Sequence, residues 1–88
     1  MDHDTRLKRL RFRASHRGTR EADLMIGGFC DTHCESWDQA QIAWFEALLE
    51  EQDVDIMAWA IGAQPCPPEW DGAMMHAMRK LDFVPVSR

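Results

Sequence analysis

Residues 15–25, SHRGTREADLM, mark the point where the chain passes from one expected helix to the next. Gly18 is placed at the break because glycine adopts backbone conformations that other residues avoid. If Gly18 is at or near the N-cap of the next helix, Glu21 falls at position N3, where its carboxylate favours the helix dipole and can bond back to the cap N–H. Arg17 has no such explanation, because a cation at the start of a helix is mildly unfavourable.

On both sides of this turn, apolar residues repeat at spacings of three and four, as in amphipathic helices. The first expected helix spans residues 5–14 and buries Leu7, Leu10 and Ala14. The second spans residues 19–34 and buries Ala22, Met25, Ile26, Phe29 and Cys30. Gly27 and Gly28 are unusual inside it, since each costs about 1 kcal/mol relative to alanine. Close approach of another helix would justify one of them.

Three more helices are expected after residue 34. The third opens with a capping box formed by Ser36 and Gln39. Its core face is Ile42, Phe45 and Leu49, with Leu48 and Trp44 flanking.

The fourth expected helix has Asp53 as its N-cap and ends at Gly62. Its expected buried stripe is Val54, Met57 and Ile61. Pro68 suits the first turn of the fifth helix. This helix is expected to carry Trp70, Met74, Met78 or Ala77, and Leu81 toward the core and to leave Met75 and His76 off the stripe.

Strand patterns are missing from the sequence, because β-branched residues are few and no useful length alternates with period two. We therefore predict an all-α fold, a single domain over residues 1–88 built as a bundle of about five short helices. The N-terminal few residues and residues 82–88 are expected to be disordered. We expect a monomer.

Charge is distributed unevenly along the chain. Residues 1–20 carry seven Arg/Lys against two Asp, whereas residues 21–88 carry three Arg/Lys against thirteen Asp/Glu. Such an electrostatic dipole can orient a charged partner during encounter. The three cysteines are an odd number in a small chain without a secretory signal, which favours free thiols and a cytoplasmic location. No apolar run approaches the roughly 20 residues needed to cross a bilayer.

Cys30, His33 and Cys34 share one face of the second expected helix. Sulfur and imidazole at this spacing could hold zinc, but a structural site needs four ligands, and no recognisable spacing supplies the fourth. We therefore expect free thiols and no metal. The sequence offers no catalytic constellation, so we expect no enzyme. With a pI of about 5.2, it also lacks the concentrated positive charge of a nucleic-acid binder.

The stretch HRGTREADLMIGGF resembles the succinate dehydrogenase flavinylation assembly factor family, whose members carry an Arg-Gly-x-x-Glu motif before an apolar helix. The resemblance continues through FEALLE and DVDIMAWAIG to a Pro-rich connector and a final helix, over residues 9–81. It departs at His16, where many members have a second arginine.

The resemblance implies a non-enzymatic assembly factor that binds the flavoprotein subunit of succinate dehydrogenase, and in some bacteria of fumarate reductase. Such a factor promotes covalent attachment of FAD to that subunit, and the chain itself would hold no cofactor stably. The partner-binding residues implied by the resemblance are His16, Arg17, Gly18, Glu21 and Asp23.

Two other hypotheses come from different classes of protein. An antitoxin-like or regulatory module would bind a toxin or nucleic acid through its basic N-terminal helix. A small metal-binding protein would use Cys30, His33 and Cys34.

Overall fold

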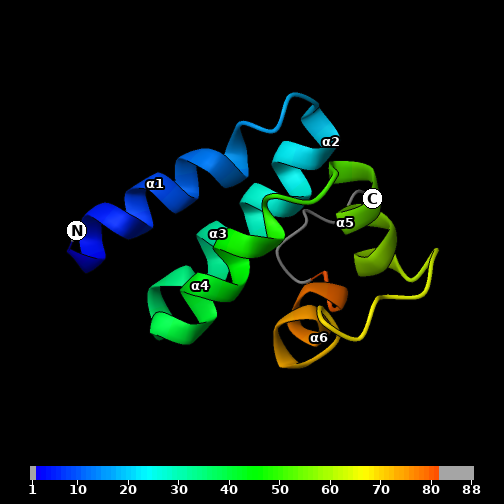
Figure 1. The fold of residues 1–88 in the computed structure, drawn as a ribbon. Helices are drawn as coiled ribbons and strands as arrows, with labels where there is room; N and C mark the ends of the chain where they lie inside the picture. The colour runs from blue at the N-terminus through cyan, green and yellow to red at the C-terminus, as the bar shows by residue number, and fades with distance from the viewer. Residues whose placement is uncertain (1, 82–88) are drawn as a thin grey trace.

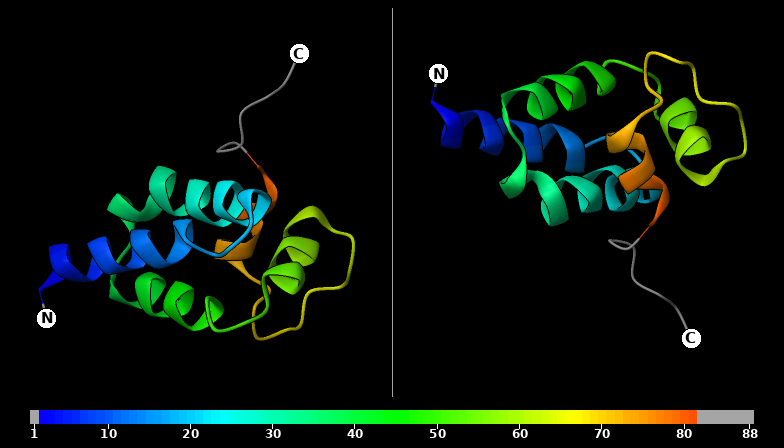
Figure 2. Two further views of the ribbon diagram at one scale, coloured as in Figure 1. Left: turned by 90° about the horizontal axis from the view of Figure 1, so that it is seen from above. Right: turned by 90° about the horizontal axis from the view of Figure 1, so that it is seen from below.

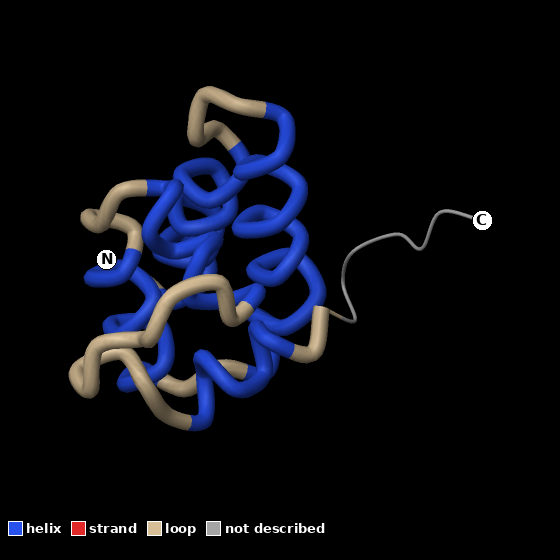
Figure 3. The backbone as a smooth tube through the Cα atoms, turned by 90° about the vertical axis from the view of Figure 1, so that its right-hand side faces the viewer, coloured by secondary structure: helices blue, strands red, loops and turns tan. Residues whose placement is uncertain are grey.

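The structure is a computed structural model that describes residues 2–81, and within that range the chain forms five helical segments joined by loops, without a strand (Figures 1 and 3). The predicted all-α fold is confirmed. The segments are α1 (His3–Ser15), a second one over residues 20–36, α4 (Gln39–Leu48), α5 (Asp53–Ile61) and α6 (Ala73–Arg79). The expected disorder of residues 82–88 concerns residues outside the described range.

The second segment is a continuous helical path with a change of pitch. It starts as α2 (Arg20–Ala22), widens into a π-helical turn over Asp23–Gly27, and continues as α3 (Gly28–His33). A 3₁₀ turn over Cys34–Ser36 ends it. π-Helical turns are rare and frequently occur at functional sites.

In the two opposite views of Figure 2, α1 lies between this second segment and α4, while α5 and α6 lie at the end away from the N-terminus. The buried face of α1 is Leu7, Leu10 and Ala14, as predicted. In the core, the rings of Phe29, Trp37 and Phe45 pack with centroids 5.0–5.8 Å apart. This aromatic cluster joins the second segment to α4.

The predicted glycine contact is real and belongs to Gly27. A Cβ atom at this position would lie 2.9 Å from the Cα atom of Ser15 and 3.2 Å from the Ala14 carbonyl oxygen. The missing side chain thus lets the end of α1 approach the second segment closely. That approach fixes the angle at which the chain leaves α1 and enters the Arg17–Gly18 turn.

The predicted buried stripe of α5 is wrong. Val54 and Ile61 are 73% and 56% exposed, and the buried residues are Ile56, Trp59 and Ala60. Both sets have helical spacing, so the sequence alone fits either face. The prediction for the end of the helix is correct, because Gly62 has a left-handed conformation with φ of 78°.

Helix ends also differ from the predictions in detail. The capping box of α4 is formed by Asp38 and Gln41, because Ser36 belongs to the preceding 3₁₀ turn. Gln52, not Asp53, is the N-cap of α5. The last helix starts at Ala73, well after Pro68.

The face of α6 differs as well. Met75, predicted to lie off the apolar stripe, is fully buried together with Met78, while Met74 is only partly buried. α6 is joined to α5 by Arg79, whose Nε donates to the Trp59 carbonyl oxygen at 3.3 Å. The aromatic pair Trp44 and Trp70 packs edge to face at 5.7 Å and connects α4 to the loop before α6.

Candidate functional site

The turn between α1 and α2 is built around Gly18, which has a φ of 113°. A side chain rarely adopts this conformation, so the prediction that Gly18 uses glycine's freedom is confirmed. A Cβ atom at Gly18 would have no neighbour within 4 Å, so the backbone here faces open space. A partner could therefore approach the Gly18 backbone directly.

The next helix begins one residue later than expected. Thr19 is the N-cap, and its hydroxyl accepts a hydrogen bond from the Ala22 N–H at 3.2 Å. Glu21 consequently occupies position N2 rather than N3, and the cap is supplied by Thr19 rather than by a Gly18–Glu21 box. The Glu21 side chain is exposed at the positive end of the helix dipole, where a carboxylate is favourable.

Arg17 has the structural role that its sequence position did not reveal. Its Nε atom donates to Asp53 Oδ1 at 2.7 Å, and its Nη2 atom donates to the Leu49 carbonyl oxygen at 2.9 Å. Only 13% of the Arg17 side chain is exposed. The expectation that Arg17 lacks a structural explanation is therefore wrong, because this side chain fastens the turn to the α4–α5 connection and to the start of α5.

Asp23 holds the turn from the other side. Its Oδ1 atom accepts a hydrogen bond from the backbone N–H of Arg17. The carboxylate comes from the π-helical turn and reaches back across the loop. Arg17 is thus held at its main chain by Asp23 and at its guanidinium by Asp53.

His16 closes the end of α1. Its ring stacks on Phe12 with a centroid separation of 4.0 Å, and its Nδ1 atom lies 2.8 Å from the Phe12 carbonyl oxygen. A carbonyl oxygen only accepts, so Nδ1 carries the proton in this contact. The other ring nitrogen is then left to accept a hydrogen bond from a partner in the neutral form, or to donate one when protonated.

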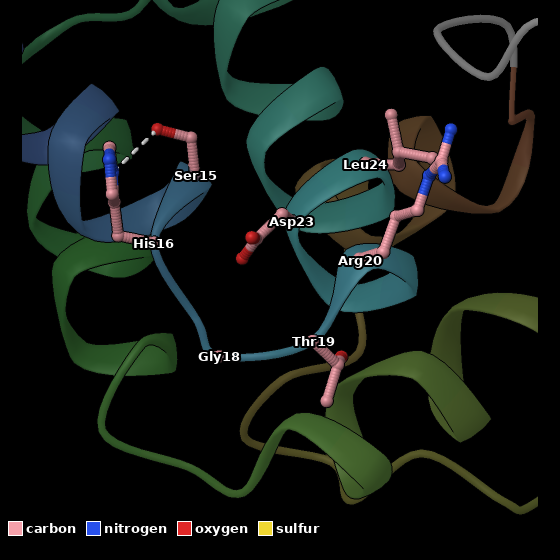
Figure 4. A pocket seen from close by; sticks show the side chains of 7 residues that line it. All are labelled: Ser15, His16, Gly18, Thr19, Arg20, Asp23 and Leu24. Carbon is pink, nitrogen blue, oxygen red and sulfur yellow. Dashed lines mark hydrogen bonds between the residues drawn. The ribbon is translucent and has the colours of Figure 1, made fainter.

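These residues surround an open hollow of about 650 Å³ (Figure 4). Ser15 and His16 lie on one side of it, Arg20 and Leu24 lie on the other, and the Asp23 carboxylate lies between them. Of the five residues implied by the resemblance, His16, Gly18 and Asp23 line this hollow. Glu21 and Arg17 are neighbours along the chain that do not line it.

The metal hypothesis receives no support from the residues that the structure describes. Across residues 2–81, no group of three or more His, Cys, Asp and Glu side chains is placed to hold a metal ion. Cys30 and Cys34 are buried free thiols, and burial raises the pKa of the Cys30 thiol well above its ordinary value. Arg11 Nε donates to Cys34 Sγ at 3.2 Å.

The basic N-terminal helix is largely neutralised within the molecule. Arg6 pairs with Glu46 at 2.7 Å, and Arg13 pairs with Glu50 at 2.6 Å. Arg11 lies 3.6 Å from Glu35, and Arg17 is held by Asp53. Four of the seven cations in residues 1–20 are thus bound to acidic residues of later segments, which leaves little of the positive face that a nucleic-acid binder needs. Among the described helices, none is long and apolar enough to cross a membrane.

Comparison with known proteins identifies the chain's relatives. The family model described as flavinator of succinate dehydrogenase matches residues 8–82. The chain belongs to this family.

Individual relatives agree with the assignment. The FAD assembly factor SdhE of Acetobacter pasteurianus is 37% identical over 73 residues, which cover 83% of this chain and 67% of that protein. The mitochondrial succinate dehydrogenase assembly factor 2-B of Drosophila persimilis is 32% identical over 79 residues, or 88% of this chain and 50% of that protein. The chain therefore spans about half the length of its insect relatives. Both relatives are named assembly factors.

Membership of the flavinator family confirms the resemblance drawn from HRGTREADLMIGGF. Two exposed apolar side chains were not predicted from the sequence, one lining the hollow and one stacked on His16 beside it. Leu24 is 51% exposed at the rim of the hollow and Phe12 is 62% exposed beside His16. Phe12 could have been found, because it lies opposite the Leu7, Leu10 and Ala14 face of α1. Leu24 lies within the π-helical turn over Asp23–Gly27, which the apolar spacings of three and four do not reveal.

Proposed function

We propose that this protein binds the flavoprotein subunit of succinate dehydrogenase and promotes the covalent attachment of FAD to it. The observation that carries the proposal is an exposed, rigidly held Gly18 turn in a chain of the flavinator family. Residues 2–81 form helices joined by loops and contain no dinucleotide-binding fold. FAD would therefore be handled in the complex with the flavoprotein.

The geometry of the turn suggests how it binds the flavoprotein. Asp23 and Asp53 hold Arg17, the residue before Gly18, at its main chain and its guanidinium. Little conformational entropy is therefore lost when a partner covers the turn. The contact is made by the Gly18 backbone, the free nitrogen of His16 and the exposed Glu21 carboxylate. The assembly factor stabilises one conformation of the flavoprotein, in which flavin and acceptor side chain are aligned.

Two finer points belong to the same proposal. We propose a fumarate reductase flavoprotein as a second client, as the resemblance to the flavinylation assembly factor family implies. We also propose that the protein acts as a monomer in the cytoplasm of a bacterial cell, in keeping with its free thiols.

The experiment compares cells that carry the wild-type gene, a deletion, or the variant Glu21→Ala. Covalent flavin is measured by in-gel fluorescence of the denatured flavoprotein subunit. We expect loss of covalent flavin in the deletion strain and a strong reduction with Glu21→Ala, whose exposed side chain contributes to the fold only its charge at the helix N-terminus.

The matched control is Glu69→Ala, since Glu69 is an exposed carboxylate in the loop before α6. This variant should leave flavin attachment unchanged. Normal covalent flavin in the deletion strain would contradict the proposal. Repeating the assay on the fumarate reductase flavoprotein tests the second client separately.

A further inference from the structure

Arg20 differs from most cations of residues 1–20 in having no acidic partner in the described part of the chain. Arg6, Arg11, Arg13 and Arg17 each pair with a carboxylate. Arg20 is exposed and lines the hollow beside the Gly18 turn. A free guanidinium at the rim of a hollow is suited to form paired hydrogen bonds with a carboxylate.

Two large apolar side chains are exposed at the same place. Phe12 is 62% exposed and stacks on His16, which lines the hollow from the α1 side. Leu24 is 51% exposed and lines it from the opposite side, one turn after Arg20 (Figure 4). Phe12, His16, the hollow and Leu24 therefore form one surface around the turn.

The placement of Phe12 and Leu24 is not required by the core. Leu7, Leu10 and Ala14 bury the inward face of α1, and Ile26 and Phe29 do the same for the second segment. Exposed leucine or phenylalanine side chains are common when scattered singly. Among the described residues, four large apolar side chains are exposed, and two of them meet at this hollow: Leu24 lines it, and Phe12 stacks on His16, which lines it. Arg20, which is unpaired within residues 2–81, lies beside Leu24.

We propose that Phe12 and Leu24 are the apolar anchors through which this chain docks on the flavoprotein subunit, and that Arg20 pairs with a carboxylate of that subunit. The proposal rests on the proposed function and names the residues that determine its partner. The flavoprotein segment that fits would place apolar side chains over Phe12 and Leu24 and an Asp or Glu beside the second of them. Its main chain would then cross the Gly18 backbone, which has open space above it.

The chemistry of such a contact assigns different parts to these side chains. An aromatic ring and a leucine that lose water on docking supply most of the affinity, because a few central residues dominate binding energy. The charge of Arg20 orients the partner and raises the rate of encounter. Its contribution therefore falls as salt is added. Gly18 contributes by the absence of a side chain.

The test is a titration of the purified flavoprotein subunit, free of covalent flavin, with the full chain. Phe12→Ser and Leu24→Ser should each weaken binding by about tenfold or more. Their unfolding midpoints should stay close to wild type, since both side chains are more than half exposed, and the Phe12 variant loses only the stack on His16. Arg20→Glu should weaken binding most at low salt. Ile61→Ser is the apolar control, because Ile61 is 56% exposed at the far end of α5. Lys8→Glu is the charge control, because Lys8 lines a separate hollow with His3 and Asp4.

The outcomes separate this inference from the proposed function. If the wild-type chain does not bind the flavoprotein, both fail. If it binds and the Phe12 and Leu24 variants bind as well as wild type, the docking surface is wrong while the proposed function stands. An equal loss in Ile61→Ser and Lys8→Glu would also overturn it, as the effect would not be local. Dimerisation of the free chain that Phe12→Ser abolishes would assign the surface to a second copy instead.

Discussion

Arg17 Nε lies 2.7 Å from Asp53 Oδ1, so a residue of the first turn holds the start of α5, although 36 positions separate the two in the chain. The same guanidinium donates to the Leu49 carbonyl oxygen at 2.9 Å. Arg17 and Asp53 are only 13% and 23% exposed at their side chains. The exposed Gly18 backbone is therefore presented by a turn that is anchored to the far half of the molecule.

Replacing Arg17 with glutamine should destabilise the fold. The variant loses a charge-assisted bond to Asp53 and leaves the Leu49 carbonyl oxygen without its donor, which costs about 1.5–3 kcal/mol in the free energy of unfolding. Urea unfolding followed by circular dichroism measures it. If Arg17 served the partner alone, unfolding would match wild type.

A double-mutant cycle identifies where Arg17 acts. Because Arg17 and Asp53 bond to each other, the loss in Arg17→Gln with Asp53→Asn should be smaller than the sum of the single losses by about 1 kcal/mol. The losses in flavoprotein affinity, measured for the same variants, should also be smaller in the double mutant than the sum of the single losses. Additive losses in affinity would show instead that Arg17 contacts the partner directly.

Gly18→Arg should damage binding more than folding. The φ of 113° imposes strain of about 1–3 kcal/mol on any side chain, but the new side chain would enter open space and leave the core untouched. Gly62→Arg is the matched control, since Gly62 has a φ of 78°, also faces open space, and lies at the opposite end of α5 from Asp53. Both variants should show similar unfolding midpoints, and only Gly18→Arg should lose flavoprotein binding. Equal binding by the two would remove Gly18 from the contact.

Gly27→Ala should be destabilising even though alanine is the better helix former. The added methyl group would meet the Ser15 backbone at 2.9 Å, which forces α1 away from the second segment and costs about 1–3 kcal/mol. Thermal unfolding measures this. Gly72→Ala, with no atom within 4 Å of the new methyl, should melt near wild type. A Gly27→Ala protein as stable as wild type would contradict the close approach.

The turn and the first two helices were predictable because their information is local. Gly18 interrupts two amphipathic patterns, and Leu7, Leu10 and Ala14 leave no second choice for the buried face of α1. The π-helical turn was not predictable, since no residue type encodes the extra residue that it accommodates. The two glycines in the second expected helix indicate that another helix approaches there. The sequence does not show that the neighbouring atoms belong to Ser15 and Ala14.

Predictions failed where two faces of a helix are both apolar or where a partner is distant in sequence. In α5, the set Val54, Met57 and Ile61 competes with Ile56 and Trp59, and packing against α6 and α2 decides between them. Arg17 finds its partners in a segment that local reasoning does not place beside it.

The three thiols should react with an alkylating reagent in a fixed order. Cys66 is partly exposed and should react first, although burial raises the pKa of its thiol and slows the reaction relative to a free cysteine. Cys30 and Cys34 are fully buried and should be protected until the protein unfolds. Mass spectrometry of alkylated peptides with and without urea reads the order. Early modification of Cys30 in the native protein would contradict the packing of the second segment.

The free energy of unfolding should fall at acid pH, because protonation of Glu46 breaks its pair with Arg6. Arg6 donates to both Glu46 oxygens, at 3.0 and 2.7 Å, and these bonds hold the pKa of Glu46 below its ordinary value. The unfolded chain therefore binds this proton first, so the contribution is present above the ordinary glutamate pKa of about 4.3 and is lost as pH falls through the lower folded value. Glu46→Gln should flatten that part of the curve in urea unfolding between pH 5 and pH 3, as roughly this range spans the loss. An unchanged slope would contradict the pairing.

If the Gly18 turn promotes covalent attachment of FAD to the succinate dehydrogenase flavoprotein, as we propose, purified components should reproduce the effect. The most direct measurement mixes purified flavoprotein, FAD and this chain, and follows covalent flavin over time by fluorescence of the denatured subunit. We predict that wild type and Gly62→Arg accelerate attachment, whereas Gly18→Arg does not. Equal acceleration by all three proteins, or by none of them, would contradict the account.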